Sequence, residues 1–144
     1  MPKVTLHNTF HVRNTLEALR AHLSQPQSYV GLSPLVVAVR DVSTVDGETR
    51  YVSVERLRLL GLVRYESLVK VTLRNTPETV EGEAAGPGGV RLGYRFTLRE
   101  RDGGTEVEDR LVVQAWNRTL LGRAVRRARE AQLARAGVLV SRLG

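Results

Sequence analysis

The chain has 144 residues, 42% of them hydrophobic and 26% charged, as is typical of one soluble globular domain. Because it contains no cysteine, no run of about 18 apolar residues and no apolar N-terminal segment, we expect a single cytoplasmic domain spanning residues 1–144, without disulfides, thiolate metal sites or a membrane span. The net charge of +7 comes from twenty Arg and two Lys, an excess that we attribute to high-GC coding, so the charge by itself is a weak indication of a nucleic-acid partner.

The first part of the chain predicts one strand followed by two short helices. Residues 3–12 alternate between apolar and polar side chains, which indicates a strand with one face toward a core. Asn14, with Glu17 three residues later, is typical of a helix N-terminus, and leucines at helical spacing follow. Pro26 then favours the start of a second, shorter helical turn.

From residue 35 onward the pattern becomes that of a β-sheet. The segments 35–46 and 50–60 flank Asp46-Gly47, a strong hairpin signal, and therefore predict a pair of antiparallel strands. In the second segment the apolar positions change parity between Val54 and Leu57, which indicates a bulge or a strongly bent strand.

Four further strands complete the predicted sheet, over residues 62–73, 78–85, 90–99 and 105–116. The strand over 78–85 is short and polar, as is typical of a sheet edge, whereas 90–99 has the clearest alternation in the chain. Because the connections between the strands are short, we expect an antiparallel meander.

Residues 119–143 predict a long amphipathic helix that Asn117 or Thr119 caps. At about 1.5 Å per residue this helix would be about 36 Å long, so it needs a large apolar partner, which the sheet offers. The stripe that would face the sheet consists of Leu121, Val125, Ala128, Gln132, Leu139 and Leu143. The opposite side carries Arg123, Arg126, Arg127, Arg129 and Glu130.

Four stretches follow the element order of a known superfamily: TFHVRNTLEALRAHLSQPQSYVGLSPLV, SLVKVTLRNTPETVEGEA, GGVRLGYRFTLRERDGGTEVEDRLVV and LLGRAVRRAREAQLARAGVLVSRL. With them the chain resembles the START-like, or SRPBCC, superfamily, which includes bacterial polyketide cyclase/dehydrase and lipid-transport proteins. The resemblance implies an α+β helix-grip fold, in which a seven-stranded curved antiparallel sheet wraps around a long C-terminal helix and two short helices follow the first strand. The run after Tyr29 departs from the aromatic-and-proline pattern of many members.

The resemblance also implies a cavity between the concave face of the sheet and the long helix. We therefore expect the protein to bind or carry a hydrophobic or aromatic small molecule there, such as a lipid, a quinone or a polyketide-like compound. Tyr65, Ser67, Tyr94 and Gln132 are the polar residues that could orient it, although each also fits a packed position in the core. The expected ligand-binding residues are Tyr65, Ser67, Val69, Leu92, Tyr94, Phe96, Leu111, Val113, Leu121, Val125, Ala128 and Gln132.

Catalysis by a cyclase or dehydratase is an alternative that the sequence leaves open. Asp109 shares its strand face with apolar residues, so a desolvated carboxylate there could abstract a proton from a polyketide-like substrate, with Tyr94 as a second catalytic candidate. An ion pair of Asp109 with Arg95 or Arg110 explains the same position without catalysis.

Metal, cofactor and nucleic-acid sites have weaker support. His7 and His11 would lie about 13 Å apart along a strand, too far to share a metal ion, and we expect no metal or cofactor. Basic rows that include Arg91, Arg95 and Arg99 could contact RNA or a ribosome, but no exposed aromatic residues interleave with them. We interpret these rows as solvated faces, and the oligomeric state stays open.

Overall fold

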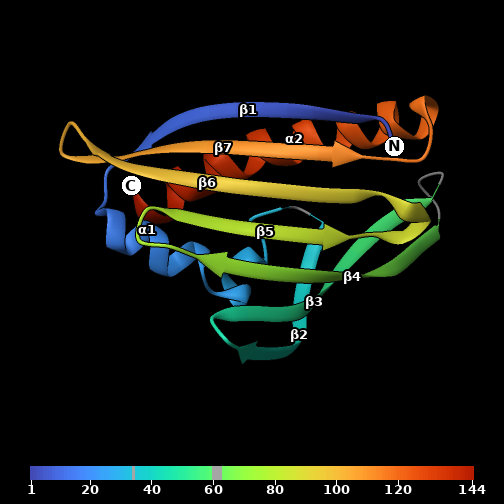
Figure 1. Ribbon diagram of the computed structural model, residues 1–144, viewed down its shortest axis with the longest axis horizontal. Coiled ribbons are helices and arrows are strands. Elements are labelled where there is room, and N and C mark those ends of the chain that lie inside the picture. The colour runs from blue at the N-terminus through green and yellow to red at the C-terminus, as the bar shows by residue number, and fades with distance from the viewer. Residues whose placement is uncertain (34, 60–62) are drawn as a thin grey trace.

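Seven antiparallel strands form one open sheet, and a long C-terminal helix lies along one of its faces (Figure 1). This computed structural model describes residues 1–33, 35–59 and 63–144, and it describes the side chains in those ranges except at 57–59, 63–65 and 87. The elements are β1 (Lys3–Val12), α1 (Leu16–Leu23), η1 (Pro26–Tyr29), β2 (Val36–Val45), β3 (Glu48–Leu59), β4 (Val63–Asn75), β5 (Thr79–Ala85), η2 (Pro87–Gly89), β6 (Arg91–Arg101), β7 (Gly104–Gln114) and α2 (Arg118–Leu143). This order confirms the predicted α+β helix-grip fold.

The strands follow one another across the sheet in the order β1-β7-β6-β5-β4-β3-β2. Each strand from β2 to β7 pairs with the next along the chain, whereas β1 pairs with β7, from Lys3 opposite Gln114 to Val12 opposite Thr105. Figure 1 shows β1 and β2 at the two edges, with β2 and β3 bending away from the direction of the other strands. Helix α2 packs on the face of the sheet toward which β2 and β3 bend, and it contacts chiefly β1 and β7.

β5 lies in the middle of the sheet, between β4 and β6, so its prediction as an edge strand is wrong. Val80 and Gly82 are buried on the inner face, and they alternate with Glu81 and Glu83 on the outer face. The polarity of this segment therefore reflects one solvated face of an antiparallel strand rather than an unpaired edge.

A bulge or a strong bend was predicted for β3, and its ladder with β4 has no bulge, since the register is continuous from Glu48 opposite Arg74 to Leu59 opposite Val63. The strand bends instead, as Figure 1 shows. The apolar parity changes because polar Ser53 and Glu55 face the interior. Register shifts occur on the other side of β3, in its pairing with β2.

The first helix begins one residue later than its sequence signal indicates. Thr15 is the N-cap of α1, and its hydroxyl accepts a hydrogen bond from the backbone N–H of Ala18 at 3.1 Å. The Asn14 side chain donates instead to the carbonyl of Leu143 at 2.8 Å, which ties the start of α1 to the end of α2. The second short helix forms at η1, where Pro26 was expected to start it.

The apolar core has two parts. One contains Leu19, Leu23, Phe96, Val107 and Leu139, all fully buried, and joins α1 and η1 to the sheet and to the C-terminal half of α2. The other joins β7 to the N-terminal half of the helix, and its buried members are Leu111, Val113, Ala115, Leu121 and Ala128. Tyr94 packs against both parts. Full burial of one large apolar side chain stabilises the fold by about 1.5–3 kcal/mol.

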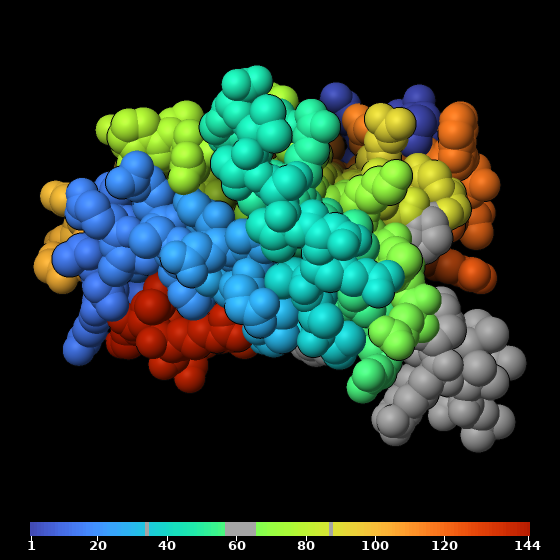
Figure 2. All heavy atoms as spheres, turned by 90° about the horizontal axis from the view of Figure 1, so that it is seen from below, coloured from blue at the N-terminus to red at the C-terminus, as the bar shows by residue number. Residues whose placement is uncertain are grey.

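Helix α2 is anchored at both ends. Asn117 caps its start, since the side-chain oxygen accepts from the N–H of Leu120 at 2.8 Å. At its end, the Arg142 guanidinium donates to the carbonyls of Ser28 and Val30 at 2.6 and 2.8 Å. Figure 2 shows the red end of α2 beside the blue segments of α1 and η1. In the described part of the chain, no helix has the length and apolar character needed to span a membrane.

Candidate functional site

A cavity of about 390 Å³ lies between the N-terminal half of α2 and the inner face of the sheet. This volume falls in the range of about 300–1,000 Å³ that small-molecule pockets occupy. The described residues that line it are Ser33, Leu35, Glu55, Ser67, Val69, Ala84, Gly86, Val90, Leu92, Leu120, Arg123, Ala124, Arg127, Ala128 and Ala131.

The cavity exists because its helical wall is built from small side chains. Ala124, Ala128 and Ala131 follow one another at spacings of four and three residues, so they share one face of α2. Their methyl groups leave space between the helix backbone and Val69 and Leu92 on the sheet. These alanines could have served only to bring the helix close to the sheet, but the structure places them on the wall of a cavity.

A few polar groups interrupt this apolar lining. Glu55 and Ser67 are cross-strand partners on β3 and β4 and both point inward. Arg123 and Arg127 are exposed, as predicted for the solvated side of α2, and they also line the cavity. Burial raises the pKa of Glu55 above its ordinary value, and the positive charge of Arg127 offsets part of this rise. The polar groups thus bring charges of both signs to one apolar cavity.

Apart from Tyr65, the predicted ligand-binding residues divide into three groups. Ser67, Val69, Leu92 and Ala128 line the cavity. A second group packs in the core beside it, without lining it in the described structure: Phe96, Leu111, Val113, Leu121 and Val125. The Tyr65 side chain lies outside the described residues. Tyr94 and Gln132 form the third group and have separate polar surroundings.

Tyr94 lies flat across the inner face of β5, where only a glycine leaves room for it. A Cβ atom at Gly82, its cross-strand neighbour, would lie 2.1 Å from the tyrosine ring. The Tyr94 ring packs edge-on against Phe96, with 5.6 Å between centroids, and its buried hydroxyl has no hydrogen-bond partner among the described groups. Burial raises the pKa of Tyr94 well above its usual range, so the hydroxyl stays protonated and can donate a hydrogen bond.

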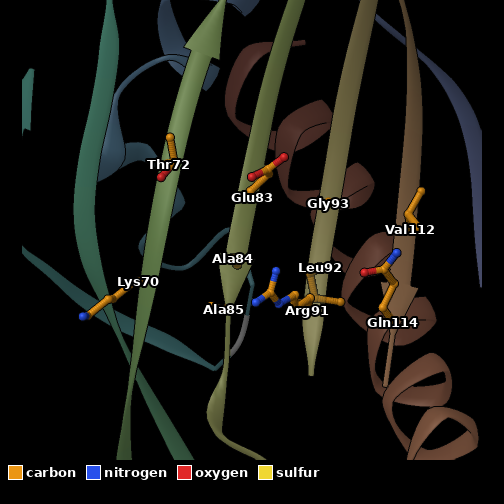
Figure 3. Close-up of a pocket in the computed structure, with 10 residues that line it drawn as sticks. All are labelled: Lys70, Thr72, Glu83, Ala84, Ala85, Arg91, Leu92, Gly93, Val112 and Gln114. Atoms are coloured by element: carbon orange, nitrogen blue, oxygen red, sulfur yellow. The ribbon is translucent and has the colours of Figure 1, made fainter. Parts of the chain in front are cut away.

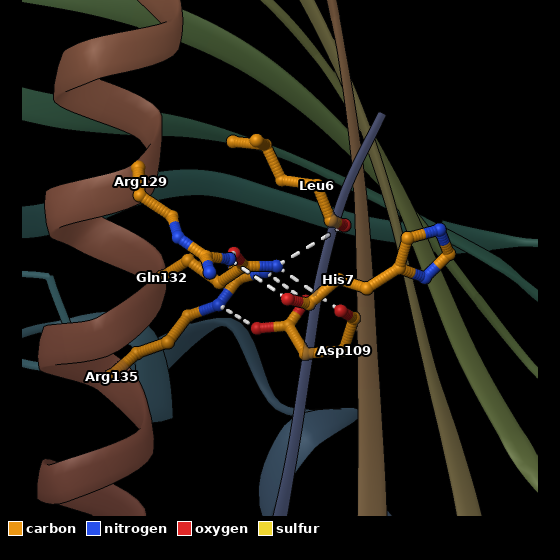
Figure 4. A network of polar contacts seen from close by, with 6 residues as sticks. All are labelled: Leu6, His7, Asp109, Arg129, Gln132 and Arg135. Carbon is orange, nitrogen blue, oxygen red and sulfur yellow. Dashed lines mark hydrogen bonds and ion pairs between the residues drawn. The ribbon is translucent and has the colours of Figure 1, made fainter. Parts of the chain in front are cut away.

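Asp109 is fully buried and accepts both hydrogen bonds of a two-point contact with Arg135, one of them from Nε at 2.6 Å (Figure 4). The expected partners of Asp109 were Arg95 and Arg110, but Arg95 pairs with Glu81 at 2.8 Å. Sequence reasoning passed over Arg135. Its position three residues after Gln132 puts it on the buried stripe of α2, where a charged side chain needs a partner of opposite charge.

Gln132 extends this network to the backbone of the sheet. Its amide nitrogen donates to the carbonyl of Asp109 at 3.1 Å and to that of Leu6 at 3.4 Å, while its oxygen accepts from Arg129 at 2.7 Å. Arg129 also donates to the carbonyl of His7 at 2.8 Å. As Figure 4 shows, these side chains reach from α2 to β1 and β7. The network fixes the helix on the sheet and leaves the Asp109 carboxylate occupied.

A second hollow, of about 480 Å³, lies on the outer face of the sheet (Figure 3). It forms across β4 to β7 where Gly93 presents no side chain to the surface. Lys70, Arg91 and Glu83 border it with mixed charge. The described residues contain no group of three His, Cys, Asp or Glu side chains that could hold a metal ion.

Comparisons with known proteins support the fold. No family model and no curated protein sequence matches the chain. The Zhui aromatase/cyclase from Streptomyces sp. R1128 is 14% identical with a TM-score of 0.67, and the match covers 96% of this chain and 94% of that one. A START superfamily protein from Mycobacterium smegmatis is 13% identical with a TM-score of 0.63, covering 94% and 98% of the two chains.

The di-domain ARO/CYC StfQ from the steffimycin biosynthetic pathway is 9% identical with a TM-score of 0.73, over 96% of this chain and 49% of that chain. This chain therefore matches about half of that two-domain protein. At such identities the likeness concerns the path of the backbone and not the chemistry of the site. The chain has the START-like, helix-grip fold.

Proposed function

We propose that the protein binds or carries a hydrophobic small molecule in the cavity between α2 and the sheet. The observation that carries this proposal is the cavity of about 390 Å³, whose walls are mostly aliphatic and whose polar groups are few. Burial of apolar ligand surface there would stabilise the complex by about 25 cal/mol per Å² before the costs of ordering are subtracted. A small number of polar groups then orients the ligand.

Binding without catalysis is favoured over a cyclase reaction. Two of the structural neighbours are named as aromatase/cyclase proteins, which makes a carbonyl substrate worth testing. Asp109, however, is held by Arg135, and neither it nor Tyr94 is among the described cavity-lining residues. If the protein is an enzyme, Glu55 is the carboxylate that its described residues offer to a substrate in the cavity.

The arginine-rich surface is the less favoured site of action. Arg95 is already paired with Glu81, and the outer hollow combines Lys70 and Arg91 with Glu83. Mixed charges of this kind give a weaker attraction for a polyanion than a continuous basic patch would.

The test is native mass spectrometry of the purified protein, followed by denaturing extraction of whatever is bound. Ala124→Phe fills the cavity from the helix, and Leu133→Phe is the matched control because Leu133 is 52% exposed on the same helix. We expect a co-purified apolar compound, or a rise in melting temperature with added apolar ligands, that Ala124→Phe abolishes and Leu133→Phe preserves. Ligand-free protein that no apolar compound stabilises would contradict the proposal.

A further inference from the structure

We infer that the cavity takes an amphipathic anion, with an aliphatic body inside and a carboxylate or similar acidic head group at Arg123 and Arg127. This inference rests on the proposed function and names the class of ligand. It follows from the distribution of charge around the cavity and from the kind of side chains that form its walls.

The two arginines are placed to receive a head group. Arg123 and Arg127 lie one helical turn apart on α2, so their guanidinium groups project from the same face of the helix. Both residues are exposed while also lining the cavity, which puts their charges at the boundary between cavity and solvent. Among the described side chains neither forms a hydrogen bond or an ion pair within 4.0 Å. A carboxylate is the group that a guanidinium binds with two parallel hydrogen bonds.

The charge balance at this end of the cavity favours an anion over a cation. Glu55 is the acidic residue among the described lining residues, and Arg123 and Arg127 line the same cavity. Burial raises the pKa of Glu55, and the positive charge of Arg127 offsets only part of this rise. With two arginines and one carboxylate, the described lining residues leave an excess of positive charge for an anion. A cationic head group would meet two like charges and one carboxylate, which is the poorer arrangement.

The walls favour an alkyl or other aliphatic body. Val69, Val90, Leu92 and Leu120 line the cavity together with the alanines of α2, and no described lining residue carries an aromatic ring. A planar aromatic ligand usually gains from stacking on such rings, whereas an aliphatic chain needs only apolar surface.

Three probes with one alkyl chain separate head-group recognition from burial: dodecanoate, 1-dodecanol and dodecylamine. Binding is measured by isothermal titration at pH 7.5, with each probe below its micelle-forming concentration. We expect dodecanoate to bind at least about tenfold more tightly than 1-dodecanol, a difference of about 1.4 kcal/mol, because only the carboxylate forms charge-assisted hydrogen bonds with the guanidinium groups. Dodecylamine should bind more weakly than the alcohol.

Variants then assign the effect to residues. Arg123→Met should reduce the preference for dodecanoate over 1-dodecanol to near unity without weakening the alcohol. Glu55→Gln should strengthen dodecanoate binding, since it removes a like charge. Arg126→Met is the matched control, because Arg126 is exposed on the same helix and does not line the cavity, and it should change neither affinity.

Two outcomes would overturn the inference in different ways. Equal affinity for dodecanoate and 1-dodecanol, or equal losses for both probes in Arg123→Met, would remove the head-group assignment and leave the proposed function standing. Failure of all three probes to bind would remove the proposed function, and the inference with it.

Discussion

Single residues decide how the interior is filled, and the contact between Gly82 and Tyr94 is the clearest example. The tyrosine ring lies over the glycine, where any side chain would collide with it. Its ring joins the two parts of the core, so a displacement of Tyr94 is transmitted to both. The glycine in β5 is therefore a requirement of packing and not of backbone conformation, since its φ is not positive.

Gly82→Ala should destabilise the fold by about 1–3 kcal/mol, because the new methyl group forces the Tyr94 ring out of its position. Gly93→Ala on the neighbouring strand is the matched control, since its Cβ would meet nothing within 4 Å. Without a clash, this control should be neutral or stabilising by about 0.4–1 kcal/mol. Urea unfolding followed by circular dichroism measures both values. Equal stabilities of the two variants would contradict the account of Tyr94.

The buried ion pair of Asp109 with Arg135 is the other residue-scale feature with a large expected effect. Arg135→Met should cost about 3–5 kcal/mol, because it leaves a fully buried carboxylate without its partner. The double variant Asp109→Leu/Arg135→Met should recover much of this loss, since no unpaired charge remains. The measurement is again urea unfolding. A loss below about 1 kcal/mol in Arg135→Met would show that water reaches the carboxylate.

At the scale of elements, α2 is a helix held at three places along its length. Asn117 caps its start, the network of Arg129, Gln132 and Arg135 holds its middle on β1 and β7, and Arg142 binds its end to the η1 region. The N-terminal half of α2 forms the helical wall of the cavity. The helical wall of the cavity therefore lies between the cap at Asn117 and the network around Gln132.

The contact between α1 and the end of α2 should make stability depend on pH. Burial lowers the pKa of His22 below its ordinary value of 6.5, and the positive charge of Arg142 lowers it further. The folded protein thus holds His22 neutral, with Nε2 3.3 Å from Arg142 Nη1, while the unfolded chain protonates it near pH 6.5. Its contribution to stability is present above pH 6.5 and is lost as the pH falls to the folded-state pKa.

His22→Gln should therefore flatten the fall in the free energy of unfolding between about pH 7 and pH 5. Urea unfolding at a series of pH values measures the slope for the variant and the parent protein. Identical slopes would mean that His22 does not titrate differently in the folded and unfolded states.

Much of the element order could be predicted from sequence, because each strand of an antiparallel sheet with one wet face alternates in polarity. Alternation carries no information on lateral order, so the polar strand β5 was misplaced at an edge. Glu55 and Arg135 were missed for a related reason. Each is a charged residue in an apolar pattern. Its role becomes visible only when the fold brings it beside residues from a distant part of the chain.

At the scale of the whole molecule, the first strand of the chain pairs with the last and so joins the two ends of the sequence in one sheet. β1 pairs with β7 along its whole length, and the carbonyls of Leu6 and His7 receive the side chains that hold the middle of α2. The first strand is therefore a support for both the sheet edge and the helix. Pairing between segments so far apart in the sequence slows folding, because the long intervening chain must be closed into a loop.

A chain lacking residues 1–12 should not unfold cooperatively, because β7 loses its neighbour, Gln132 loses the carbonyl of Leu6 and Arg129 loses that of His7. Removal of Met1 alone is the matched control, since this residue is 55% exposed. Thermal unfolding followed by circular dichroism distinguishes the two. A sharp transition in the shortened chain would show that β2 to β7 and α2 form a domain by themselves.

The network of Arg129, Gln132 and Arg135 lies at the middle of α2, between a densely packed part of the core and the part that contains the cavity. The densely packed part includes the fully buried residues Leu19, Phe96 and Leu139. The cavity is bordered on the helix side by Leu120, Ala124 and Ala131. A side chain that borders the empty space has fewer neighbours on that side than one in the packed core, so a change in its size should disturb the fold less. The volume of the cavity can thus change through a few positions on one helix, while the packed part of the core keeps its contacts.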